Sequence, residues 1–488
     1  MPFTQSDAGR LRAAVQSLVD EHSIPGVALG VVEGDDLVYS EGFGYGDIEN
    51  DQPMRPEMRQ RIASITKTMV GLCVMALVDE GRLSLDAQIP ALLPDIRFKG
   101  PAEALTLWHL LTHTGGIGEA PNAEDLARPF EKLFSSEPKH QPLAEAYDAG
   151  ITLEVAPGTK WAYANHGYML LGEIVSRIEG GDIQDVLHRR IFEPLAMRDS
   201  DILDLPHNGL SAGYHRAPGD DEREMLTRIG LEPPEEETVD GINIRGKYQY
   251  VWDRPAGAVQ STIPDMARYA SALLRRGAGI VRPDTFDRMV ADQWRPDPRL
   301  PGWGLSFAVR NYCGHAGFSH GGSAFGGWNS YMAVFPREGR ALLVHVNLMY
   351  DQFDPVIVPR IIQAFWGAPD FALPEAPVDP RILATAAGVY EAPIPGPLTN
   401  FRVMTNVGRV MVAARDGGLV LTSRRGPWKA GVPMAPASPL EPDLFALLTG
   451  EPQPPLITVL RDTSGAVTGL RFPQLVDMHR NGSIEPWT

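Results

Sequence analysis

The chain has 488 residues but only two cysteines, Cys73 and Cys313. Cys73 lies in a run of apolar residues, so neither a disulfide framework nor a cysteine metal site is expected. The twelve histidines are scattered without the spacing of a metal site. The scarcity of cysteine argues against a disulfide-rich domain. Together with the scattered histidines, it predicts a protein that uses no metal and no other cofactor.

Long hydrophobic runs and excess positive charge are also missing. No apolar stretch reaches about 18 residues, the length that a membrane-spanning helix needs. Segment 1–7 lacks the basic start and apolar core of a secretory signal. With 61 acidic against 44 basic residues the net charge is −17, which opposes binding to nucleic acid and to anionic membranes. We therefore expect a cytoplasmic protein that binds neither.

The length and the hydrophobic content of 43% are sufficient for two hydrophobic cores. In residues 1–368, strand patterns near both ends enclose a mostly helical middle. This order predicts an α/β (α+β) domain with a central antiparallel sheet flanked by helices. A proline-rich linker is expected at 369–380. Short alternating strands separated by turn signals predict a small all-β barrel or sandwich at 381–488.

Local patterns predict individual elements in the first domain. Ser6 or Asp7 is expected to cap a first helix. The apolar face of that helix comprises Leu11, Val15, Leu18 and Val19. Strands are predicted at 27–33, 37–43, 304–310, 328–336 and 340–347, with a closing helix near 355–366. Region 203–255, rich in proline, glycine and acidic residues, is expected to be an irregular surface insertion.

Ser64 and Lys67 lie three residues apart at the head of an apolar run. Residues at this spacing share one face of a helix, so the hydroxyl and the amine can come within hydrogen-bonding reach. A serine becomes a nucleophile when a base takes its proton, and lysine can be that base once burial or charge lowers its pKa. From these residues alone, a serine that starts a helix beside a lysine that reaches the surface is an equal alternative.

The same Ser-x-x-Lys pattern occurs at Ser136 and Lys139. There Pro138 interrupts a polar stretch, which argues against a helix that joins the two side chains. We therefore expect Ser64, and not Ser136, to be the nucleophile.

Tyr163 and Asn165 form the chain's one Tyr-x-Asn motif, on a loop that enters an apolar helix. The tyrosine could pass protons between a nucleophile and a leaving group. The asparagine amide could hold both a lysine and a substrate carbonyl. The alternative is an asparagine that caps the helix beside a packed aromatic ring.

Segment 314–328 is dense in glycine and contains His320. Glycines on a strand edge would let a ligand approach the backbone closely, and backbone N–H groups there could stabilise an oxyanion. The His-x-Gly pattern also occurs at His113, His207 and His315. A single such histidine is therefore not diagnostic.

In this order, the motifs resemble those of the penicillin-binding-protein-type serine hydrolases. This family includes class C β-lactamases, D-alanyl-D-alanine carboxypeptidases, D-aminopeptidases and esterases of the β-lactamase fold. The resemblance covers about residues 8–366 and implies a β-lactamase/transpeptidase-like domain. It rests on segments 61–67, 81–86, 110–117, 163–165, 256–268 and 320–322.

The resemblance implies a role for each motif residue. Ser64 would be the nucleophile, Lys67 its base, and Tyr163 the proton shuttle. Asn165 would align the substrate. The backbone N–H groups of Ser64 and Ser323 would form the oxyanion hole, and Gly321 and Gly322 would contact substrate beside the catalytic His320.

His320 stands where many family members carry the lysine of a Lys-Thr-Gly motif. A permanent positive charge suits the carboxylate of penicillins and D-Ala-D-Ala peptides, whereas a histidine is mostly neutral at pH 7. We therefore expect poor turnover of benzylpenicillin and a preference for substrates without a carboxylate beside the scissile bond. An exposed His320 with an ordinary pKa of about 6.5 would gain charge toward pH 5.5 and partly restore carboxylate binding.

The preferred function is a serine peptidase or amidase that acts through an acyl-enzyme on small peptides, with D-residues among its candidate substrates. The alternatives are a carboxylesterase, an acyl transferase or peptide cyclase in which an amine deacylates Ser64, and a catalytically silent ligand-binding protein. Segment 387–390 opens a C-terminal part that looks like the lipocalin-like barrel of D-aminopeptidases and peptide-cyclising thioesterases. A monomer and a homodimer both fit the sequence.

Overall fold

The computed structural model describes residues 2–118, 120–122, 134–135, 141–202, 209–219, 223, 237–350, 353–368, 372–391, 409–423, 428–450, 454–472 and 477–481. The pair Ser136 and Lys139 lies outside these residues, as do His207 and most of the acidic part of region 203–255.

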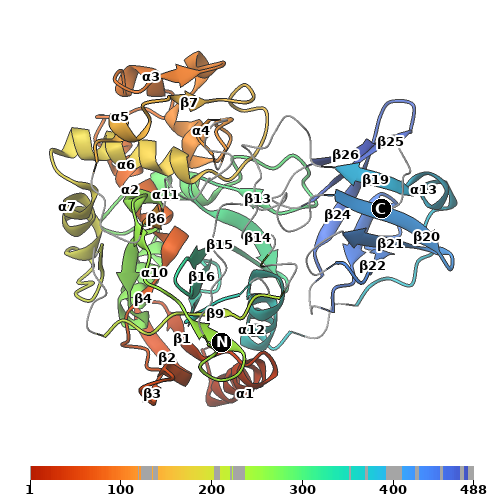
Figure 1. Ribbon diagram of the computed structural model, residues 1–488, viewed down its shortest axis with the longest axis horizontal. Helices are drawn as coiled ribbons and strands as arrows, with labels where there is room; N and C mark the ends of the chain where they lie inside the picture. The colour runs from red at the N-terminus through yellow and green to blue at the C-terminus, as the bar shows by residue number, and fades with distance from the viewer. Residues whose placement is uncertain are drawn as a thin grey trace.

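The first domain is built on one large antiparallel sheet (Figure 1). Its strands follow the order β13 (Gly302–Trp303), β14 (Ala308–Tyr312), β15 (His315–Ala324), β16 (Trp328–Phe335), β17 (Arg340–Val346), β1 (Gly26–Glu33), β2 (Asp36–Asp47), β3 (Gln52–Pro53). Strand β1 pairs with β17, so Val27 lies opposite Val346 and segments from both ends of the domain meet in the sheet. This arrangement confirms the predicted central antiparallel sheet.

Helices cover both faces of the sheet (Figure 1). The three main helices on one face are α2 (Thr66–Asp79), α6 (Asn165–Glu179) and α10 (Ile263–Leu274), and those on the other are α1 (Gln5–Glu21) and α12 (Val358–Trp366). Successive strand residues point to opposite faces. In β17, Leu343 therefore packs with the α2 side, whereas Leu342 and Val344 pack with the α1 side. The active-site candidates lie on the α2 side.

Shorter elements complete this domain. The helices are η1 (Ala63–Ile65), α3 (Ile89–Leu92), η2 (Ala102–Ala104), α4 (Leu107–Leu111), α5 (Leu143–Ala146), α7 (Ile183–Leu187), η4 (His188–Phe192), α9 (Arg254–Gly257), α11 (Pro283–Val290) and η5 (Phe353–Ile357). The strands are β4 (Gln60–Arg61), β5 (Phe98–Lys99), β6 (Phe134–Ser135), β7 (Ile151–Thr152), β8 (Asp201–Ile202), β9 (Tyr214–Arg216), β10 (Asn243–Arg245), β11 (Tyr250–Val251), β12 (Val259–Ser261) and β18 (Leu348–Met349).

Several local predictions need correction at their boundaries. Thr4, rather than Ser6 or Asp7, caps α1; Asp7 instead completes the capping box from the third helical position. The strand expected at 304–310 begins only at Ala308. The closing α-helix begins at Val358, directly after the π-helical turn η5.

The C-terminal part is a closed antiparallel barrel, drawn in blue at the right of Figure 1. Its strands are β19 (Gly388–Glu391), β20 (Arg409–Arg415), β21 (Gly418–Ser423), β22 (Val432–Pro436), β23 (Leu444–Leu447), β24 (Leu456–Arg461), β25 (Val467–Arg471) and β26 (Asp477–Asn481). Alternating residues such as Leu419 and Leu421 fill its core, and Ile382 of α13 (Pro380–Thr385) packs against them. The predicted second, all-β domain is confirmed as a barrel.

Across the part of the chain that the structure describes, no helix has both the length and the apolarity to cross a bilayer.

Candidate active site

Ser64 lies in the 3-10 turn η1, which leads directly into α2. The preceding residue, Ala63, has a φ of 47°, an uncommon conformation for a residue with a side chain. The Nζ atom of Lys67 lies 3.0 Å from Ser64 Oγ. The turn and the helix therefore bring the hydroxyl and the amine together, as the spacing predicted.

Lys67 is fully buried, which rules out the alternative in which it reaches the surface. Its Nζ donates to the backbone oxygen of Ala256 at 2.5 Å and lies 5.0 Å from the centre of the Tyr163 ring. Nearly all of α2 is buried with it. These contacts hold the amine beside Ser64.

Tyr163 is half-buried and stacks on His113, with ring centroids 4.3 Å apart and planes at 29°. The backbone N–H of Ala164 donates to Nδ1 of His113 at 3.1 Å. A ring nitrogen that accepts carries no proton, so a neutral His113 has its proton on Nε2. Burial, followed by the charge of Lys67, holds the pKa of His113 well below its ordinary value. His113 therefore stays neutral and orients Tyr163.

His320 lies on β15 and is 4% exposed, so the condition under which it was expected to gain charge, an exposed ring, is not met. Its Nδ1 lies 2.6 Å from the carbonyl oxygen of Gly321, to which it must donate. Burial, with a smaller contribution from Lys67, lowers the pKa of His320 to about 3. The ring therefore stays neutral at pH 5.5, and the gain of charge that an exposed histidine would show there is not expected. The physical cause is that β15 is an interior strand whose histidine packs against Trp303 and Tyr163.

Gly322 allows β15 to lie directly against η1. A Cβ atom at this position would overlap the carbonyl oxygen of Ile62 and the hydroxyl of Ser330. This close approach brings the strand that carries Ser323 beside the turn that carries Ser64. It supports the predicted oxyanion hole, whose use in catalysis stays a prediction.

Two glycines just after β15 do not make room for a ligand, as the glycine-rich segment was expected to do. Gly326 and Gly327 have positive φ angles of 97° and 113°. The space beside Gly327 is filled by the backbone of Gly213 and Tyr214, and Gly326 lies against the carbonyl oxygen of Lys247. These two glycines therefore let the chain pack on itself rather than admit a ligand to a free strand edge.

Asn165 is the first residue of α6, and Ala164 occupies the cap position. The alternative in which Asn165 caps this helix is therefore wrong. Asn165 is half-buried at the entrance of the helix, two residues after Tyr163. The substrate contacts of Asn165, Gly321 and Gly322 stay predictions.

Three rings at the site, those of His113, Trp161 and Trp303, had no role assigned to them from the sequence. The Trp303 ring lies 5.2 Å from His113 and 5.7 Å from His320, and the Trp161 ring lies 5.4 Å from Trp303. His113 belongs to the motif segment 110–117, and Trp161 precedes Tyr163 by two residues, so both carried a signal. Trp303 carried none, because only the fold brings β13 to the site.

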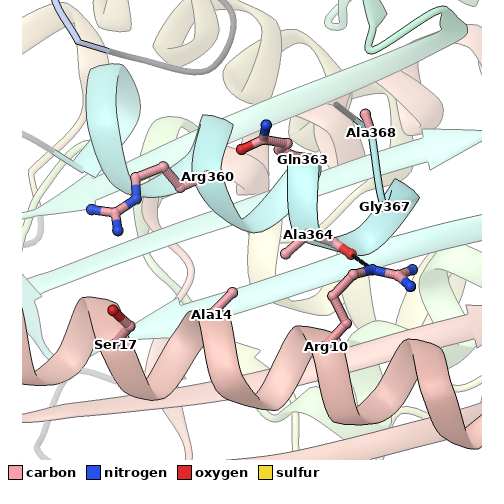
Figure 2. Close-up of a pocket in the computed structure, with 8 residues that line it drawn as sticks. All are labelled: Arg10, Ala14, Ser17, Arg360, Gln363, Ala364, Gly367 and Ala368. Atoms are coloured by element: carbon pink, nitrogen blue, oxygen red, sulfur yellow. Dashed lines mark hydrogen bonds between the residues drawn. The ribbon is translucent and has the colours of Figure 1, made fainter. Parts of the chain in front are cut away.

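Within the described residues, no group of histidine, cysteine, aspartate and glutamate side chains could hold a metal ion. A shallow groove of about 340 Å³ lies between α1 and α12, where Arg10 donates to the backbone of Ala364 (Figure 2). These helices cover the face of the sheet opposite α2. The groove is therefore separate from Ser64.

The Beta-lactamase family model matches residues 11–364. Esterase EstB of Burkholderia gladioli is 28% identical over 374 residues, which cover 70% of this chain and 91% of that protein. Penicillin-binding protein 4 of Amycolatopsis lactamdurans is 27% identical over 428 residues, covering 80% of this chain and 98% of that protein.

Among solved structures, the octameric penicillin-binding protein homologue from Pyrococcus abyssi shares the fold with a TM-score of 0.59 at 22% identity. The match covers 98% of this chain and 99% of that chain, and so includes the barrel region. Together with the Ser64 and Lys67 geometry, the family match gives a firm assignment: the chain belongs to the β-lactamase family.

Proposed function

We propose that this protein is a serine hydrolase that forms an acyl-enzyme on Ser64 and cleaves amide bonds of small peptides or peptide-like substrates. The observation that carries the proposal is the 3.0 Å contact between Ser64 Oγ and the fully buried amine of Lys67. A lysine that is enclosed and directed at a serine hydroxyl is suited to remove its proton.

In this mechanism, Lys67 takes the proton of Ser64 as Oγ attacks the substrate carbonyl carbon. The backbone N–H groups of Ser64 and Ser323 stabilise the oxyanion that forms. Tyr163, whose ring lies 5.0 Å from Lys67 Nζ, passes the proton to the leaving nitrogen. Water then attacks the acyl carbon, and Lys67 accepts a proton from it. That proton passes to Ser64 Oγ as the acyl–oxygen bond breaks and the carboxylic acid leaves.

The electrostatics of the site support a substrate without a carboxylate beside the scissile bond. His113 and His320 are both neutral at pH 7, because burial lowers the pKa of each. Lys67 contacts Ser64 Oγ and donates to the backbone oxygen of Ala256, and in the proposed mechanism it acts as the base rather than as a counter-ion. A buried carboxylate without a charged partner would be costly.

A carboxylesterase is the second candidate, and the esterase EstB relative, 28% identical over 91% of its own length, favours it. An alcohol is a better leaving group than an amine. Ester cleavage therefore depends less on protonation of the leaving group through Tyr163.

Matched p-nitroanilides and p-nitrophenyl esters of the same acyl group test the bond type, with benzylpenicillin as the carboxylate-bearing comparison. We expect Ser64-dependent turnover of the anilide and slow turnover of the penicillin. Turnover of the ester alone would favour the esterase. Intact mass of the protein after exposure to each compound shows whether an acyl-enzyme forms. A silent binding protein would show neither product nor adduct, and an acyl transferase would favour added amines over water.

A further inference from the structure

The barrel is joined to the first domain by a buried polar contact at loop 294–303. The hydroxyl of Thr458 on β24 donates to Oδ2 of Asp297 at 2.9 Å. Arg299 pairs with Asp297 at 2.8 and 2.9 Å, and with Asp443 of the barrel at 2.9 and 3.0 Å. Asp297 therefore lies at the centre of a clamp between the domains.

The clamp is strongly ionic. Asp297 is 5% exposed, yet hydrogen bonds from Arg299 lower the pKa of Asp297 to about 2 against the opposing effect of burial. Its carboxylate is charged at neutral pH and has Arg299 and Thr458 as partners. Removal of one partner from a buried charged group is costly, so the geometry of the clamp should be well defined.

The loop that carries the clamp also carries Trp303. Its base is closed by two backbone hydrogen bonds between Trp294 and Trp303, at 2.8 and 2.9 Å. From there the Trp303 ring reaches His113 and His320. The tip of the loop thus contacts the barrel while its end lies in the candidate active site.

A second contact links the barrel to the same region. Arg471 of β25 donates to the carbonyl oxygen of Pro296 at 3.2 Å and is paired with Asp477 of β26. Burial lowers the pKa of Lys160, and the charges of Glu154 and, to a smaller extent, Asp477 oppose that shift. The contact of Arg471 with Pro296 therefore joins the barrel a second time to the loop that carries Trp303.

We propose that the barrel is a positioning element of the active site. Through Thr458 and Asp443 it holds Asp297 and Arg299, and so fixes Trp303 against His113 and His320. Trp161 and Tyr163 are half-buried and pack against Trp303, with ring centroids 5.4 and 6.5 Å away. The aromatic, uncharged surface that they present favours aromatic or large apolar acyl groups over small ones. This inference rests on the proposed acyl-enzyme function, in which those acyl groups are transferred to Ser64.

The test compares wild type with Thr458→Val, which removes the hydroxyl but keeps the side-chain shape. The matched control is Thr422→Val, because the Thr422 hydroxyl bonds to Met411 within the barrel. If Thr458→Val does not fold, Asp443→Asn replaces it as the test variant, because Asp443 is half-buried and pairs with Arg299 in the same clamp. Circular dichroism and thermal melting establish that each variant is folded at the assay temperature.

Two fluorophosphonates are used, one with a small alkyl group and one with a phenyl-bearing group. We expect the phenyl probe to label wild type faster, and Thr458→Val or Asp443→Asn to lower the ratio of the two rates about 5-fold. Thr422→Val should leave the ratio unchanged. Equal ratios in all folded proteins, or a ratio that falls equally in the control, would overturn the inference.

Acrylamide quenching separates this inference from the proposed function. The difference between wild type and Trp303→Phe isolates the fluorescence of Trp303, and the same pair is made in the Thr458→Val background. Greater quenching of Trp303 in that background supports positioning by the barrel, and unchanged quenching contradicts it. Wild type that neither probe labels would instead overturn the acyl-enzyme function on which the inference rests.

Discussion

His113 stacks on Tyr163 with ring centroids 4.3 Å apart, and its Nδ1 accepts the backbone N–H of Ala164 at 3.1 Å. One buried imidazole thus fixes both the ring and the following backbone of the Tyr-x-Asn motif. His113 has a φ of 57°, a conformation that asparagine also tolerates. It is a positioning residue for Tyr163.

His113→Asn should therefore keep the local backbone but lose the stacked ring. We expect kcat to fall by about 10- to 100-fold, because a small displacement of a catalytic group is enough for such a loss. His315→Asn is the control. His315 is the first residue of β15, and its ring stacks on Trp366 of α12 rather than on a residue of the site. A wild-type kcat in His113→Asn, measured with a chromogenic substrate, would show that this stack does not orient Tyr163.

Lys67→Arg should abolish acylation although charge and length are nearly kept. Arginine does not surrender its proton in a protein, and loss of a general base typically costs about 10²- to 10⁴-fold in rate. Lys99→Arg, at an exposed position on β5, is the control. The rate of fluorophosphonate labelling is the measurement, and retention of more than about a tenth of it would show that Lys67 is not the base.

The preference for an uncharged amide over its matched free acid should not change between pH 7.5 and 5.5. Burial penalises the charged imidazolium, so the pKa of His320 lies at about 3 and protonation begins only well below this range. The ratio of kcat/KM for an amide and its matched free acid should be flat across it. His320→Lys should shift the ratio toward the free acid about tenfold. A wild-type ratio that titrates near pH 6 would contradict the buried, neutral histidine.

Gly322→Ala should strongly reduce acylation by separating β15 from η1. The added Cβ would overlap the carbonyl oxygen of Ile62 and the hydroxyl of Ser330, so the strand must move away from Ser64. We expect a loss of at least about 10²-fold in labelling rate, the typical cost of one oxyanion-hole donor. Gly9→Ala, on an open position of α1, should be neutral or slightly stabilising. Normal labelling of Gly322→Ala would mean that this close approach is not needed.

Local pattern was enough to predict the elements whose neighbours are close in sequence. The face of α1 with Leu11 and Val15, and the pairing of Ser64 with Lys67 across one turn, both follow from helical spacing. The glycines after β15 were misassigned because their function depends on Gly213 and Lys247, which come from distant segments.

The same reason explains the two main gaps in the predicted site. The burial of His320 could not be predicted, because no local pattern shows that β14 and β16 enclose its strand or that Trp303 covers it. Trp303 itself lies about 140 residues from Tyr163 in sequence, and the clamp at Asp297 depends on contacts with the barrel. Burial by distant elements, which also sets the pKa of His320, cannot be inferred from spacing.

The most direct test of the account is to locate the covalent label. The protein is treated with a fluorophosphonate, digested and mapped by mass spectrometry, with Ser64→Ala as the parallel sample. We predict one adduct on the peptide that contains Ser64 and none in Ser64→Ala. An adduct on the Ser136 peptide, or labelling that persists in Ser64→Ala, would contradict Ser64 as the nucleophile.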